Sequence, residues 1–154
     1  MHSRAVSFTW LFLLDRRSLC LYSVSAMTSK VLLEKLPETK EIEGAKRWDE
    51  EKGEFAQIAY KEEMHHLALF TLKRGFTRGD HYHRKKDEVF YVAAGRIRAE
   101  FRDMDTGETG SMALERGHKL RIQPGVWHIF YGIEDALVVE YSPQHYDKND
   151  AFRV

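Results

Sequence analysis

The chain has 154 residues, enough for one domain with a buried core, and 43% of them are hydrophobic. Its 24 basic and 24 acidic residues cancel, which argues against a nucleic-acid or membrane partner recognised through charge. A single cysteine, Cys20, excludes any disulfide within the chain. Since unpaired cysteines are typical of reducing compartments, we expect a cytoplasmic protein.

Residues 1–26 differ in composition from the rest, and we interpret them as a leader outside the folded domain. The apolar run from Val6 to Leu14 is too short to span a bilayer. A secretory signal with a small-residue cleavage site at 24–26 and a mitochondrial presequence are both alternatives. We favour a misassigned start, with the functional protein beginning at Met27.

Residues 27–54 are highly charged and contain Pro37, Gly44 and Gly53. This composition predicts an N-terminal arm that leads into the main domain, with a short helix over 31–35.

From residue 55 to 154, short strands separated by turn signals predict an all-β barrel or sandwich. The first predicted pair is 56–60 with 66–73, joined by the polar turn 61–63. The segment 87–92 is rich in β-branched and aromatic residues, and 96–102 alternates apolar and charged side chains. A hairpin turn at 105–108 and strands at 110–114, 119–123, 126–130 and 136–141 complete the barrel.

Three residues in this region have the spacing H-x-H-x4-E, namely His81, His83 and Glu88. On a strand both histidines point to the same side, and the charged turn at 84–87 lets Glu88 begin a new strand in its own register. His128 would join them from another strand if the sheet closes into a barrel or a second sheet faces the first. Three imidazoles and a carboxylate suit one divalent transition metal ion such as Mn, Fe, Ni or Zn, and leave positions for water or a substrate.

These residues resemble the two motifs of the cupin superfamily, over roughly residues 75–141. The first motif, G-x5-H-x-H-x3,4-E-x6-G, is met at every spacing by Gly75, His81, His83, Glu88 and Gly95. The second, G-x5-P-x-G-x2-H-x3-N, is met by Gly117, Gly125 and His128, while Gln123 replaces the usual proline and Gly132 the usual asparagine. The departures fall on turn residues and leave the metal ligands in place.

The resemblance implies an antiparallel double-stranded β-helix, the jelly-roll barrel, and it implies that His81, His83, Glu88 and His128 are metal ligands. The run from Arg78 to His83 is similar to the R-G-x-H-x-H of cupin-type ketoisomerases that act on nucleotide-linked deoxysugars. The related 3,5-epimerases share R-G-x-H, and in both groups the histidines resemble general bases that need no metal. Metal-dependent cupin-type phosphosugar isomerases show a histidine pair, E-V-Y and a later W-x-H. The similar residues here are Glu88, Val89 and Phe90 and the pair Trp127 and His128.

Other side chains are candidates for chemistry beside the ligands. Glu140 lies in an apolar strand, and if it faces inward it is a candidate general base, as is whichever of His65 and His66 faces inward. Arg78 is a candidate for holding a substrate phosphate or carboxylate, and Tyr60 and Tyr91 are candidates for contacting substrate oxygens. Lys85 and Lys86 are expected in an exposed turn.

The apolar side chains of Trp127, Ile129 and Tyr131 lie on the face opposite His128 and need cover. A second copy of the chain would provide it, so we expect a homodimer, although cover from within the chain is the alternative.

Together these features predict a metal-binding cupin that acts on a small polar substrate such as a sugar or sugar phosphate, as an isomerase or epimerase. An iron-dependent dioxygenase, a non-catalytic metal- or ligand-binding cupin and a metal-free epimerase are the alternatives, because fold and metal do not select a reaction.

Overall fold

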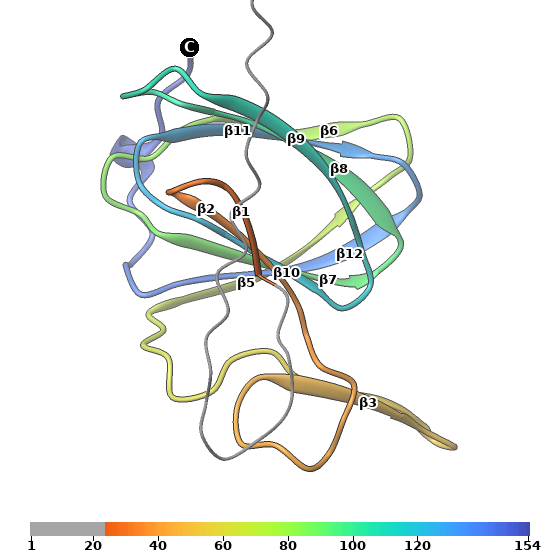
Figure 1. Cartoon of the computed structure of the whole chain (residues 1–154). Helices are drawn as coiled ribbons and strands as arrows, with labels where there is room; N and C mark the ends of the chain where they lie inside the picture. Colours follow the sequence, from red (N-terminus) through yellow and green to blue (C-terminus); the bar gives the residue numbers. More distant parts are fainter. Residues whose placement is uncertain (1–23) are drawn as a thin grey trace, which may run out of the picture.

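Residues 24–154 are described by the structure, which is a computed structural model, and almost all of their regular secondary structure is β-strand (Figure 1). Two sheets face each other, and a separate hairpin projects from them. The strands are β1 (Val24–Thr28), β2 (Val31–Lys35), β3 (Lys46–Glu50), β4 (Gly53–Gln57), β5 (His66–Leu72), β6 (Thr77–His81), β7 (Glu88–Ala94), β8 (Arg96–Asp103), β9 (Thr109–Glu115), β10 (His118–Ile122), β11 (Val126–Gly132) and β12 (Ala136–Ser142), followed by the 3-10 helix η1 (Lys148–Asp150).

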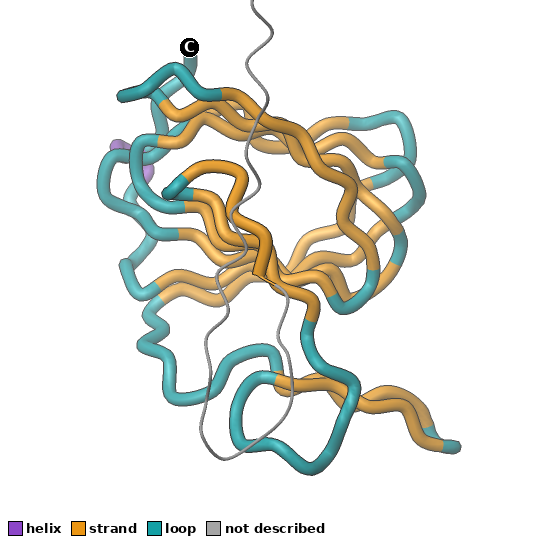
Figure 2. The backbone as a smooth tube through the Cα atoms, in the orientation of Figure 1, coloured by secondary structure: helices purple, strands orange, loops and turns teal. Residues whose placement is uncertain are grey.

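The six-stranded sheet has the order β1-β2-β10-β7-β12-β5, and the four-stranded sheet has the order β6-β11-β8-β9. All of their strand pairs are antiparallel. The predicted all-β fold with an antiparallel jelly-roll barrel is confirmed, and Figure 2 shows the strands of the barrel joined by loops.

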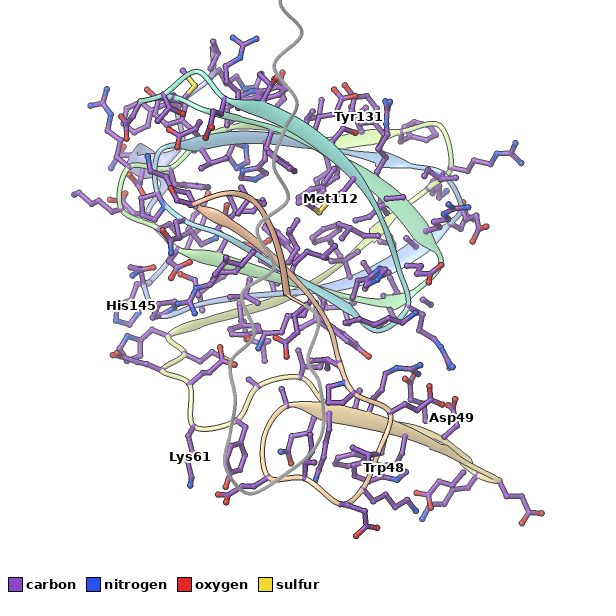
Figure 3. The ribbon with its side chains drawn as sticks, viewed as in Figure 1. Trp48, Asp49, Lys61, Met112, Tyr131 and His145 are labelled. Carbon is purple, nitrogen blue, oxygen red and sulfur yellow. The ribbon has the colours of Figure 1, made fainter. Side chains whose placement is uncertain are left out.

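The core fills the space between the sheets because each strand turns alternate side chains inward. In β8, for example, Ile97, Ala99 and Phe101 are buried while the charged residues between them are not. Met112 points toward this space from β9 (Figure 3). The remaining members of the core cluster are Val31, Phe70, Leu72, Phe90, Val92, Leu114, Leu120, Ile122, Val126, Phe130, Ala136 and Val138.

The predicted helix over 31–35 is wrong, because these residues form β2. A helix of five residues is too short to be stable on its own. As a strand, the segment pairs in full with β10 and buries Val31 completely in the core. Part of the predicted arm therefore belongs to the barrel.

The predicted pairing of 56–60 with 66–73 is also wrong. β4 pairs with β3, across the tight turn before Gly53, and β5 pairs with β12. The intervening segment instead crosses the outside of the six-stranded sheet, where Glu62 contacts Lys119 and the Tyr141 hydroxyl.

The hairpin β3–β4 extends away from the barrel and carries Trp48 and Asp49, as Figure 3 shows. Trp48 stacks on Phe55 with ring centroids 4.4 Å apart. The predicted boundary between arm and barrel, at 54/55, falls inside β4. Most of the predicted leader, residues 1–23 with Cys20, lies outside the described residues. Within 24–154, no helix has the length and apolar character needed to cross a membrane.

Candidate functional site

A pocket of about 310 Å³ lies between the two sheets. Its walls come from β5, β7 and β12 of one sheet and from β6 and β11 of the other, completed by the segments after β6 and β12. The residues that line it are His66, Ala68, Phe70, Arg78, Gly79, His81, His83, Lys86, Glu88, Phe90, His128, Phe130, Glu140, Tyr146 and Ala151.

Glu88 is the buried carboxylate of this pocket, with a side chain that is 4% exposed. Its Oε1 lies 3.4 Å from Nε2 of His83, and its Oε2 lies 3.4 Å from Nε2 of His128. The other ring nitrogens face backbone carbonyls, with His83 Nδ1 2.6 Å from Asp150 O and His128 Nδ1 3.3 Å from Val126 O. Donation from Nδ1 to these carbonyls leaves the Nε2 lone pairs directed at a carboxylate, an arrangement that requires a cation or a proton between them.

His81 adds a donor from the opposite wall. The ligand atoms of His81, Glu88 and His128 all lie within 4.8 Å of one another. The His83 ring packs edge-on against that of His81, with centroids 4.7 Å apart. The four residues of the two motifs thus gather in one place, and two imidazoles with a carboxylate form a donor set that suits a divalent transition metal.

The electrostatics of the pocket favour the protonation states that metal ligands need. Burial opposes the charge on Glu88, but the hydrogen bond from His83 and the nearby His128 and Lys86 lower its pKa to about 2. Burial, reinforced by His128 and His83, lowers the pKa of His81 to about 4, and burial also lowers the pKa of His128. At neutral pH the carboxylate is therefore charged and both imidazoles are neutral.

His83 behaves differently from the other two histidines. Burial opposes its charge, but the hydrogen bond and the negative charge of Glu88 raise its pKa. A proton on His83 Nε2 and a metal ion would therefore compete for the same place beside Glu88.

Lys86 is a pocket residue, so the prediction that it lies in an exposed turn is wrong. It is 6% exposed, and its Nζ lies 3.0 Å from Glu88 Oε1 and 2.6 Å from Glu140 Oε1. Burial opposes its charge, but the two carboxylates raise its pKa, which keeps the ammonium charged. One signal in the sequence could have indicated that Lys86 lies in the pocket. Lys86 stands two residues before Glu88, and in an extended chain this spacing places both side chains on the same side.

Glu140 and His66, the candidate bases, both face the pocket. Glu140 lies on β12 and is 18% exposed, and its Oε1 is 3.4 Å from His66 Nε2 on the neighbouring strand β5. The inward member of the histidine pair is therefore His66, while His65 is exposed and stacks on His145. Figure 3 shows His145 outside the barrel.

The three substrate-binding candidates lie in different places. Arg78 lines the pocket, and its guanidinium carbon is 4.6 Å from the ring centroid of Phe70. Tyr60 is absent from the pocket lining and donates a hydrogen bond to Glu43. Tyr91 is also absent from the lining, and its buried hydroxyl has no hydrogen-bond partner among the described residues.

Asp150 holds the segment between His83 and Glu88 in shape, a role that the sequence did not reveal. Its carboxylate accepts hydrogen bonds from the backbone N–H groups of Arg84, Lys85 and Lys86, at 3.0, 3.2 and 3.1 Å. Its carbonyl faces His83, as described above. No local pattern marks this residue, because it lies more than sixty positions from the segment that it supports.

Comparison with solved structures finds several proteins of similar fold. It superimposes on the dTDP-4-dehydrorhamnose 3,5-epimerase of Sulfolobus tokodaii with a TM-score of 0.69 and 20% identity, covering 84% of this chain and 80% of that one. A second similar structure is a mutant of the 3,4-ketoisomerase QdtA from Thermoanaerobacterium thermosaccharolyticum, in complex with TDP-4-keto-6-deoxyglucose. It superimposes with a TM-score of 0.67 and 19% identity, covering 82% of this chain and 89% of that one. At these identities the likeness concerns the fold, and it confirms the predicted cupin resemblance.

A relative in sequence is the UDP-2-acetamido-2,6-beta-L-arabino-hexul-4-ose reductase of Pseudomonas aeruginosa, which is 28% identical over 103 residues. The match covers 64% of this chain but only 28% of the relative, so the chain corresponds to a minor part of that protein. A family model described as the polysaccharide biosynthesis C-terminal domain matches residues 48–151, which include all the pocket-lining residues. The chain belongs to the polysaccharide biosynthesis C-terminal domain family, and its barrel is a cupin.

Proposed function

We propose that this domain isomerises or epimerises a nucleotide-linked keto-deoxysugar, by removing and returning a proton on a carbon next to a carbonyl group. The observation that carries the proposal is the contact of Glu140 with His66 and Lys86, in the same pocket as the donor set around Glu88. The names of the similar structures, an epimerase and a ketoisomerase bound to a nucleotide-linked ketosugar, support this class of substrate.

In this reaction the C–H bond next to the ketone breaks, the proton passes to the Glu140 carboxylate, and the electron pair spreads onto the carbonyl oxygen. His66, 3.4 Å from Glu140, can exchange the proton with it. Lys86 places a positive charge beside the same carboxylate and can donate a hydrogen bond to the oxygen as it becomes negative. A proton returned to the opposite face of the carbon, by a donor on that side, inverts that centre. A proton returned instead to the former carbonyl carbon moves the ketone, as the hydroxyl proton of the first carbon passes to the former carbonyl oxygen.

We propose also that His81, Glu88 and His128, with His83 beside them, hold one divalent transition metal ion. When bound, the ion would supply Lewis acidity that polarises the substrate carbonyl. Arg78, at the edge of the pocket, has the planar donor fork that suits a diphosphate.

Isotope exchange tests the reaction without knowledge of the product. The protein is incubated in D2O with dTDP- and UDP-linked 4-keto-6-deoxysugars, and deuterium at the carbons next to the ketone is followed by NMR and mass spectrometry. We expect deuterium to enter with wild-type protein and at least a hundredfold more slowly with Glu140→Gln. His145→Ala, an exposed histidine outside the pocket lining, is the matched control and keeps the wild-type rate. Equal rates for wild type and Glu140→Gln would overturn the role of Glu140, and absence of exchange with both substrate series would overturn the reaction.

Metal analysis tests the donor set separately. The metal bound to protein purified without added metal is measured by elemental mass spectrometry, and the protein is then titrated with Mn, Fe, Ni and Zn. We expect close to one ion per chain, lost in the double variant Glu88→Gln/His128→Ala. Occupancy that survives this double variant would contradict the assignment of the ligands.

An iron-dependent dioxygenase is the second candidate, because two histidines and one carboxylate are also the ligand set of many non-haem iron oxygenases. The test is oxygen consumption by the iron-loaded protein with the same ketosugars. Consumption in proportion to product, without deuterium exchange, would favour the dioxygenase over the isomerase.

We propose further that the chain forms a homodimer. Leu67 and Leu69, on the edge strand β5, are 64% and 62% exposed, which supports contact with another chain. The side chains expected to need cover, Trp127, Ile129 and Tyr131, are already partly buried within one chain. Sedimentation equilibrium is the measurement, and a monomer at micromolar concentration would refute the dimer.

A further inference from the structure

The strand that carries His81 contains one residue more than its partner strand requires. Along β6 and β11, Thr77 pairs with Tyr131, Arg78 with Phe130 and Gly79 with Ile129, but His128 pairs with His81. Asp80 is therefore an extra residue, a β-bulge next to the pocket.

The bulge decides which way His81 points. Phe130 and His128 both face the interior, two residues apart on β11, and their partners Arg78 and His81 face it as well although they are three residues apart. In an unbroken strand Asp80 would face inward and His81 outward, because side chains alternate. Asp80 thus allows one short strand to place both Arg78 and His81 in the pocket.

The backbone at the bulge has an unusual conformation. Gly79 has a φ of 96° and Asp80 a φ of 64°, and Lys61 is the other non-glycine residue with positive φ within 24–154. A Cβ at position 79 would lie 3.0 Å from the His128 carbonyl oxygen, so the strands approach closely here. Such a conformation persists at a residue other than glycine only when its surroundings hold it, and Asp and Asn tolerate it better than other side chains do.

A side-chain contact across the two strands is available to hold it. The indole Nε1 of Trp127 donates a hydrogen bond to Asp80 Oδ1, at 3.2 Å. Trp127 precedes His128 on β11, so this contact ties the outward face of the bulge to the strand that carries His128.

We propose that Asp80, held by Trp127, is a positioning residue that keeps the β6 bulge formed and so directs His81 toward His128 and Glu88. The proposal rests on the proposed function only in treating His81 as a site residue, since the bulge itself can be observed without any activity. Asp80 does two things that alanine does not: it tolerates positive φ, and it accepts the indole hydrogen bond.

The test measures the position of His81 directly. The ring centroids of His81 and His128 are 5.0 Å apart, so protein labelled with 13C-histidine should show a nuclear Overhauser cross-peak between the two rings. The second measurement is the dissociation constant for Co²⁺, followed by visible absorption. In Asp80→Ala we expect the cross-peak to fall to less than half its intensity and Co²⁺ to bind at least tenfold more weakly. Asp80→Asn should restore both, because asparagine tolerates positive φ and keeps an acceptor oxygen.

Two further variants keep the test decisive. Trp127→Phe removes only the donor and should weaken the cross-peak, which provides an answer if Asp80→Ala does not fold. Lys61→Ala places alanine at the other positive φ, away from the pocket, and should leave cross-peak and Co²⁺ affinity unchanged. A wild-type cross-peak in both Asp80→Ala and Trp127→Phe would overturn the proposal, as would failure of Asp80→Asn to restore it. If Co²⁺ binds to none of the proteins, the metal part of the proposed function fails, and the cross-peak still decides the role of Asp80.

Discussion

Replacing Gly132 by asparagine would restore the residue usual in the second cupin motif, yet we expect it to destabilise this protein. A Cβ at position 132 would lie 2.2 Å from the carbonyl oxygen of Lys73 and 2.9 Å from its carbon. Since carbon and oxygen atoms rarely approach closer than about 3.3 Å, the Lys73 backbone would have to move by roughly 1 Å. Gly132 also donates to Phe76 O and accepts from Gly75 N, both at 2.9 Å, so the shift strains two backbone hydrogen bonds.

The magnitude follows from these contacts. Overpacking costs about 1–3 kcal/mol, and each backbone hydrogen bond that is lost costs about 1 kcal/mol, which gives about 3–5 kcal/mol for Gly132→Asn. That is a large part of the roughly 5–15 kcal/mol by which domains are stable. The assay is urea denaturation followed by tryptophan fluorescence, with the free energy of unfolding extrapolated to zero urea.

Gly75→Asn is the matched control, since the Gly75 N–H donates a hydrogen bond to the Gly132 carbonyl. Gly75 has a φ of 81°, and a Cβ there would meet nothing within 4 Å. Because asparagine tolerates this conformation, Gly75→Asn should cost less than about 1 kcal/mol. Equal stability of Gly132→Asn and wild type, or equal losses for the two variants, would refute the steric argument.

Three other predictions concern a hydrogen bond on the outside of the six-stranded sheet, the segment between His83 and Glu88, and the histidines of the pocket. Tyr141→Phe should lower the free energy of unfolding by about 1–2 kcal/mol, because the buried hydroxyl donates to Glu62 at 2.8 Å; urea denaturation measures it, and an unchanged midpoint would contradict it. Asp150→Ala should release the 84–86 segment and speed amide exchange of Lys86 by at least tenfold, as measured by hydrogen–deuterium exchange, whereas unchanged exchange would rule out this support. The pKa of His81 is lowered to about 4 in the fold from an ordinary 6.5, so the unfolded chain binds the additional proton and stability should fall as pH decreases from 6.5 to 4. Urea midpoints at pH 7 and 4.5 should show a smaller pH dependence in His81→Asn than in wild type, and an identical dependence would contradict the shift.

The barrel and the meeting of the motif residues were predictable because they depend on local signals. Alternation of apolar and charged residues predicted β8, and the spacing of His81, His83 and Glu88 predicted that they meet. The segment 31–35 was not predictable as a strand, since its structure is determined by β10, which lies more than eighty residues later.

The shape of the pocket was less predictable, for two physical reasons. The bulge at Asp80 depends on a backbone conformation, and only the adjacent Gly79 hinted at it. The burial of Lys86 depends on two carboxylates, and one of these, Glu140, comes from a strand fifty-four positions later. Sequence patterns show which residues share a strand face, but they do not show which faces meet across the barrel.

The donor set joins the two layers of the barrel. His81 and His128 belong to the four-stranded sheet, whereas Glu88 belongs to the six-stranded sheet. An ion bound by all three would cross-link the sheets, much as a disulfide would. Its binding energy would then add to the stability of the whole barrel. The melting temperature would then rise as the site fills.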